Sequence, residues 1–121
     1  MTVSGPGFVS LQVRDLPASA AFYEKYLGFT RQDGPPQAVV FGTAPASFAV
    51  RSPLPGTDLD AVTQLGAGVG VWMHATNVQE IHDAMVAAGV PIPSAPADGP
   101  FGRTFTFSDP DGYRITLHSR A

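Results

Sequence analysis

The first clear pattern along the chain is a strict alternation of apolar and polar side chains over residues 9–14. Val9, Leu11 and Val13 are apolar, and the residues between them are polar. Successive side chains of a strand point to opposite faces of a sheet, so this period of two predicts a strand that is buried on one face.

The period then changes to that of a helix. Asp15 is suited to cap a helix N-terminus, and a proline at the first helical position is tolerated because its missing N–H would be unpaired anyway. Apolar side chains recur at helical spacing as far as Leu27, and Gly28 can take the left-handed conformation that ends a helix. We predict a helix from about Pro17 to Leu27.

Three short strands are predicted next, at residues 29–33, 38–41 and 47–51. Glycine and proline separate them, as expected for turns. The first half of the chain therefore has the order β-α-β-β-β.

The second half repeats this order. A strand at residues 70–77 ends at Asn77, which is placed to cap a helix closing on Gly89, and Asp15 and Asn77 are 62 positions apart (77 minus 15). A nearly constant offset along a whole strand-helix unit indicates an internal repeat. Strands are expected near Ile92, at 103–108 and at 113–119. The predicted inward positions of the second helix are Val78, Ile81, Met85 and Val86.

These elements predict an α+β fold in one domain of two paired βαβββ modules. Module one covers about 8–52 and module two about 69–121. The connection, about 53–68, has two prolines, three glycines and no clear period, and is long enough to act as a mobile flap.

Composition excludes several classes of function. The 121 residues include 7 basic and 10 acidic side chains, a net charge of −3, and no basic stripe that could bind nucleic acid. No window reaches the ~20 apolar residues of a membrane span, and no secretory signal is visible. The absence of cysteine excludes disulfides and thiolate metal sites. We expect a cytoplasmic protein.

Residues 11–23, the Leu27-Gly28-Phe29 segment and residues 107–115 together resemble the vicinal oxygen chelate superfamily, which includes glyoxalase I, extradiol dioxygenases and bleomycin-resistance proteins. The resemblance covers essentially the whole chain. It implies a cup-shaped half-barrel fold, commonly assembled as a homodimer.

Enzymes of that family hold a metal ion at positions that correspond here to Phe8, Gly70 and Thr116, with a further position near Phe48 or Ala49. None of these side chains suits a divalent ion, which needs imidazole, carboxylate or several oxygen ligands. The sequence therefore predicts neither a metal nor another cofactor, and is similar to the metal-free bleomycin-resistance branch of the family.

If the family's metal positions point into the cup, the alternation of side chains along each strand predicts which other residues also line it. The residues that point to the other face of the same strands are apolar, as expected for the layer under the helices. The predicted ligand-binding residues are Phe8, Ser10, Gln12, Gly70, Trp72, His74, Thr104, Thr106, Arg114, Thr116 and His118.

Trp72 can be a stacking platform for a ligand or a packing residue of the barrel or dimer seam. Phe8 likewise can be a pocket wall or ordinary packing, and Gly70 can enlarge the pocket or mark a bend. His74 and His118 can orient a ligand by hydrogen bonding, serve as a general base, or belong to a displaced metal site.

Other polar residues favour structural roles. His82 is interpreted as a solvated surface residue. The segment Asp109-Pro110-Asp111-Gly112 is a turn signal rather than a catalytic carboxylate pair.

The function predicted from these features is metal-independent binding and sequestration of a bulky aromatic small molecule such as an antibiotic, without catalytic residues. The alternatives are an enzyme, either a metal-free lyase or isomerase using His74 or His118 or a dioxygenase-like metalloenzyme with an atypical metal site, and a structural module with a collapsed cup.

Overall fold

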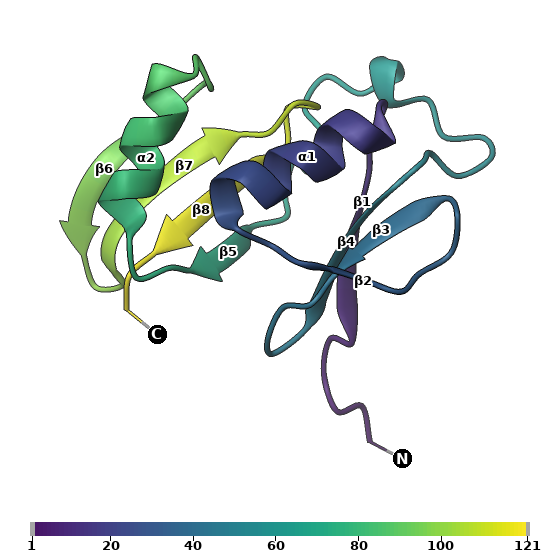
Figure 1. Cartoon of the computed structure of the whole chain (residues 1–121), viewed down its shortest axis with the longest axis horizontal. Coiled ribbons are helices and arrows are strands. Elements are labelled where there is room, and N and C mark those ends of the chain that lie inside the picture. The colour runs from purple at the N-terminus through teal and green to yellow at the C-terminus, as the bar shows by residue number, and fades with distance from the viewer. Residues whose placement is uncertain (1, 121) are drawn as a thin grey trace. The chain divides into compact units, whose positions relative to one another are not determined.

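Each half of the chain folds as a strand, a helix and three further strands, as the repeat predicts (Figure 1). The computed structural model describes residues 2–120. The chain divides between Ala61 and Val62, inside the predicted connection, into two compact units that are described separately.

In the first unit, β1 and β4 pair in parallel and the other pairs are antiparallel, which gives a mixed sheet in the order β1-β4-β3-β2. We call this sheet A. Its elements are β1 (Phe8–Gln12), α1 (Leu16–Leu27), β2 (Arg31–Gln32), β3 (Ala38–Phe41) and β4 (Ser47–Arg51), followed by a short 3-10 helix (Leu59–Ala61).

The second unit repeats this arrangement in sheet B, with the order β5-β8-β7-β6 and a parallel β5–β8 pair. Its elements are β5 (Val71–His74), α2 (Val78–Ala87), β6 (Ser94–Gly99), β7 (Gly102–Ser108) and β8 (Arg114–His118).

Several predicted strands have different bounds, and β5 covers only Val71–His74 of the predicted residues 70–77. The strand expected near Ile92 begins only at Ser94, because the prolines on both sides of Ile92 lack the N–H that a ladder needs. The strand expected over residues 29–33 is reduced to Arg31–Gln32. Phe29 instead packs its ring against the core.

The two helices begin differently although they are repeats. The Asp15 carboxylate accepts a hydrogen bond from the Ala18 backbone N–H at 3.0 Å, so its predicted capping role is confirmed. Asn77 occupies the same place before α2, but its side chain makes no capping hydrogen bond. Gly28 and Gly89 both have positive φ after their helices, as predicted.

The core of the first unit is a cluster of aromatic rings between α1 and sheet A. Tyr23 is fully buried, and its ring centroid lies 5.1 Å from Phe48, 6.4 Å from Phe41 and 6.3 Å from Phe29. These contacts fix α1 on β3 and β4 and commit one face of sheet A to the core.

The core of the second unit lies between α2 and sheet B, where α2 packs against β7 (Figure 1). The buried side chains are Val78, Met85, Phe105, Phe107, Ile115 and Leu117. Val86 was predicted to face inward and does not: its side chain is 52% exposed, because it follows Met85 by 100° around the helix.

The predicted connection is fastened at several points. The Leu54 backbone N–H donates to the Gln12 side chain at 2.8 Å, and Arg14 donates to Asp60 at 2.6 Å. Gln64 donates to the Gly112 carbonyl at 2.7 Å within the second unit. These bonds oppose the free flap motion expected from composition.

Among residues 2–120, no helix has the length and apolar character needed to cross a membrane.

The Asp15 cap is expected to contribute to stability. Asp15→Ala should lower the free energy of unfolding by about 1 kcal/mol, because it leaves a helix N–H without its acceptor. Asn77→Ala is the matched control and should cost less, since no capping bond is lost. Chemical denaturation measures both, and equal losses would contradict the assignment.

A surface ion pair joins α1 to β2 and generates a pH prediction. The Arg31 guanidinium donates two hydrogen bonds, both 2.9 Å, to Glu24, and these bonds lower the pKa of the Glu24 carboxyl. A lowered folded-state pKa adds stability at neutral pH that is lost as the carboxyl becomes protonated in acid.

Glu24→Gln should therefore lower the melting temperature at about pH 7, and the difference from wild type should shrink below about pH 4. Glu80→Gln, on an exposed carboxylate of α2 that has no partner within residues 2–120, is the control. If the difference in melting temperature between Glu24→Gln and wild type grew as the pH fell, the assigned role of the ion pair would be wrong.

Candidate functional site

The polar residues predicted to share a face on β5, β7 and β8 do so. Trp72 pairs with Thr116, and His74 pairs with His118. Thr106 pairs with Thr116 from the other side of β8. Residues paired across strands point to the same face, so the register brings these side chains together. We call this side of sheet B the open face, because the opposite side packs under α2.

Four rings gather at one end of the open face, and we call them the aromatic cluster: Trp72, His74, Phe101 and His118. The His74 and His118 ring centroids are 5.7 Å apart, and the Trp72 ring lies 6.1 Å from His118 and 5.5 Å from Phe101. Trp72 and Phe101 are 52% and 55% exposed. Two large apolar rings are thus half open to solvent within one group, as expected of a surface that stacks against a ligand.

Phe101 was missed by the sequence analysis. It lies outside the alternating strands, in the turn between β6 and β7, and only the Gly-Pro-Phe-Gly sequence around it signals a turn. Its ring reaches the open face because the turn folds over the end of the sheet.

The C-terminal segment holds that turn. The Arg120 N–H donates to the Phe101 carbonyl at 3.0 Å, and the Arg103 N–H donates to the Ser119 hydroxyl at 2.8 Å. Gly102 makes the close approach possible: its φ is 79°, and an added Cβ would collide with Ser119.

The remaining predicted residues of sheet B differ in their surroundings. Thr106 and Thr116 bond each other through their hydroxyl oxygens at 2.7 Å. Thr104 lies opposite His118. Arg114 is exposed at the far end of β8, and no hydrogen bond or ion pair holds its guanidinium within the part of the chain that is described, residues 2–120.

Gly70, just before β5, has no special backbone conformation. A Cβ there would meet only the Trp72 indole, at 3.5 Å or more, which is ordinary contact. The indole therefore borders the space that a side chain at position 70 would fill. The backbone at Gly70 has no bend that would require a glycine.

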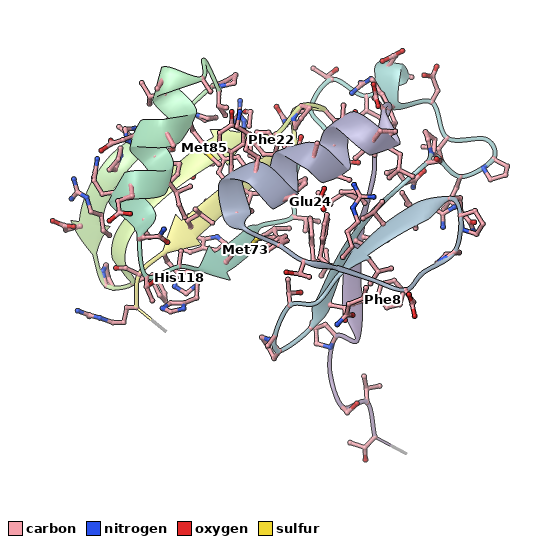
Figure 2. All side chains as sticks on the ribbon, viewed as in Figure 1. Phe8, Phe22, Glu24, Met73, Met85 and His118 are labelled. Atoms are coloured by element: carbon pink, nitrogen blue, oxygen red, sulfur yellow. The ribbon has the colours of Figure 1, made fainter. Side chains whose placement is uncertain are left out.

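Phe8, Ser10 and Gln12 lie in sheet A and are described with the first unit. Phe8 is 68% exposed at the start of β1 (Figure 2). They share the face away from α1, as predicted, while Leu11 and Val13 are buried. Gln12 is engaged by the Leu54 N–H. Val9 was placed under the helix but stays 36% exposed, because it lies at the open start of the strand.

The register also identifies the fourth position at which family enzymes hold a metal. Ala49 lies opposite Ser10, just as Thr116 lies opposite Trp72 at the equivalent place in sheet B. Phe48 points to the other face, where it packs on Tyr23. The position is therefore Ala49.

The four family positions are then Phe8, Ala49, Gly70 and Thr116. They provide one neutral hydroxyl, already bonded to Thr106, and no imidazole or carboxylate. These residues do not fit a divalent ion. Within residues 2–120, no group of three or more His, Asp or Glu side chains is arranged to hold a metal.

Charged residues on the α2 side of sheet B are paired with each other. Arg103 donates to Asp98 at 3.0 Å and to the Gln79 side chain at 2.7 Å. Hydrogen bonds from His82 and from Gln79 lower the pKa of the Asp83 carboxyl. These groups are engaged away from the open face.

His82 differs from its interpretation as a solvated residue. Its side chain is 17% exposed and its ring meets Phe105 edge to face at 5.2 Å. Neighbouring charges in the sequence indicated solvent, but the helix turns the imidazole onto the core.

The segment at residues 109–112 is a turn, as predicted. The buried Asp109 carboxylate accepts hydrogen bonds from the N–H groups of Asp111 and Tyr113. Gly112 takes a φ of 96°. The carboxylate shapes the β7–β8 turn.

The sequence matches the family model of the Glyoxalase/Bleomycin resistance protein/Dioxygenase superfamily over residues 5–117. The chain belongs to this superfamily, and the resemblance noted from its motifs is confirmed. No curated protein matches the chain by sequence.

Solved structures share the fold. TnmS3, an antibiotic binding protein from a Streptomyces species, has 24% identity and a TM-score of 0.75, with coverage of 100% of this chain and 99% of TnmS3. A protein from Agrobacterium tumefaciens solved by NMR has 29% identity and a TM-score of 0.73, with 98% and 99% covered. FosX, a fosfomycin resistance protein from Listeria monocytogenes, has 20% identity and a TM-score of 0.76, with 99% and 96% covered.

The turn that carries Phe101 generates a stability prediction. Gly102→Ala should lower the free energy of unfolding by about 1–3 kcal/mol, because a side chain is strained at positive φ and would collide with Ser119. Gly99→Ala, at the other end of the turn, is the matched control, since an added Cβ there meets nothing within 4 Å. Thermal unfolding compares the variants. A Gly102→Ala protein as stable as Gly99→Ala would show that the turn is not held as described.

Proposed function

We propose that this protein binds a bulky, partly planar aromatic small molecule, such as an antibiotic, and sequesters it without a metal ion or other cofactor. It would act in the cytoplasm as a homodimer, the assembly common in its family. The observation that carries the proposal is the pair of half-exposed rings, Trp72 and Phe101, in one cluster on the open face.

Binding by stacking needs apolar surface with a few polar groups that orient the ligand. The open face offers both, since the rings of Trp72 and Phe101 adjoin two imidazoles and a hydroxyl pair. On the corresponding face of sheet A, in the first unit, Phe8 and Ser10 are also exposed.

The family metal positions support the absence of metal chemistry in this proposal. Phe8, Ala49 and Gly70 have no ligand atom in their side chains, so a Lewis acid held as in the family enzymes would lack its protein ligands. The antibiotic-binding role of TnmS3, which shares the fold, agrees with a binding protein.

A second candidate is a metal-free lyase or isomerase. The observation in its favour is the adjacency of His74 and His118, because an imidazole can act as a general base. Chromatography of the ligand recovered from the complex distinguishes the two functions: a binding protein returns it unchanged, and an enzyme returns product.

Trp72→Ala should weaken ligand binding by about 1–3 kcal/mol, because a stacked aromatic contact is removed. A melting-shift screen with aromatic antibiotics and flavin-like metabolites identifies the ligand, since a bound ligand raises the melting temperature with concentration. Trp72 is the sole tryptophan, so quenching of its fluorescence gives the wild-type affinity, and calorimetry gives that of the variants.

Val86→Ala, which trims an exposed apolar side chain of α2 on the opposite side of sheet B from the open face, is the control and should bind as wild type does. Unchanged affinity of Trp72→Ala would remove this residue from the site and with it the main support for the proposal.

A further inference from the structure

The end of the chain fixes the two imidazoles of the aromatic cluster. After β8 the backbone carbonyl of Ser119 lies 3.2 Å from His74 Nε2, and that of Arg120 lies 2.8 Å from His118 Nδ1 (Figure 2 labels His118). A carbonyl oxygen can only accept a hydrogen bond, so each of these ring nitrogens must donate. The proton therefore sits on Nε2 in His74 and on Nδ1 in His118.

A neutral imidazole has one N–H and one nitrogen with a free lone pair. The lone pair is therefore on Nδ1 of His74 and on Nε2 of His118. Within the described residues, 2–120, neither of these atoms receives a hydrogen bond. Two acceptors with opposite tautomers thus stand side by side, with ring centroids 5.7 Å apart.

These acceptors border the stacking surface. The His118 ring lies 6.1 Å from Trp72 and 6.5 Å from Phe101, so a flat molecule stacked on the Trp72 indole would bring its edge to the imidazoles. A carboxylate or ether oxygen at that edge would face a lone pair and gain no bond, whereas a hydroxyl could donate to it.

The Arg114 cation does not reverse this preference, since it lies four residues before His118 on β8, about 13 Å along the strand. The hydroxyls of Thr106 and Thr116 bond each other with one of their two hydrogens, and Thr104 lies opposite His118. These hydroxyls can donate or accept, whereas the lone pairs of the two imidazoles can only accept.

We propose that His74 and His118 form a paired acceptor site for hydroxyl groups on the edge of the stacked ligand, so that the ligand class is a hydroxylated, phenol-type aromatic. This inference rests on the proposed function, because it concerns the same surface and adds the polar chemistry of the ligand.

The test compares two probes that differ only in hydrogen-bond donors, 2,3-dihydroxynaphthalene and 2,3-dimethoxynaphthalene. Calorimetric titration at about pH 8 keeps free imidazole uncharged. Wild type should bind the diol about tenfold more tightly than the diether, as expected for one to two hydrogen bonds.

His118→Phe and His74→Phe keep an aromatic ring and remove the acceptor. Each variant should reduce the preference for the diol over the diether several-fold, because the diether has no hydroxyl to donate to the imidazole. Trp72→Ala is the contrasting variant and should weaken both probes together, because both stack through the same ring system.

The outcomes separate the two proposals. Equal binding of both probes to wild type, with loss of both in Trp72→Ala, would overturn the acceptor site and keep the aromatic binding surface. Failure of both probes to bind at millimolar concentration would count against the surface itself, and so against both proposals.

The tautomers have their own measurement, which needs no ligand. Nitrogen-15 NMR of the imidazoles should show the Nε2–H form for His74 and the Nδ1–H form for His118. The reverse pattern, or one shared tautomer, would overturn the acceptor site even if all variants fold.

Discussion

The open face depends on the parallel register of β5 with β8. This pairing sets Trp72 opposite Thr116 and His74 opposite His118, while Ile115 and Leu117 are sent into the core. A shift of the β8 register by one residue would bury the His118 imidazole and expose Leu117, because successive side chains of a strand point to opposite faces. The cost of exposing the apolar residues and burying the polar ones therefore keeps the aromatic cluster on one face of sheet B, although no bond within the cluster has to be strong.

The two repeats use the same scaffold for different surfaces. Sheet A is fixed by the rings around Tyr23, and its face away from α1 has the exposed Phe8 and the small, buried Ala49. Sheet B has a smaller aromatic core but gathers rings on its open side. At the positions where family enzymes hold a metal, neither sheet has an imidazole or a carboxylate.

Much of the fold could be predicted from local patterns, because period and capping residues act over a few positions. β3 and β4 have the predicted bounds, and Asp15 caps α1. The predictions were wrong where contacts between distant parts of the chain determine the position of a side chain. Phe101 reaches the open face through a turn held by residues near the C-terminus, and His82 packs on Phe105 because of how α2 sits on β7. Neither contact could be predicted from the spacing of residues in the sequence. The family could be assigned from sequence motifs, whereas the tautomers depend on the path of the chain after β8.

The carbonyl groups that hold His74 and His118 belong to the main chain. Every amino acid supplies the same oxygen, so drift of the side chains at positions 119 and 120 would leave the orientation of the imidazole protons intact as long as the strand ending keeps its path. The hydrogen-bonding character of the site is in that sense robust to mutation. Under the proposed function, evolution could vary the surrounding sequence, and so the outline of the molecule that is bound, without changing which of its atoms the imidazoles contact.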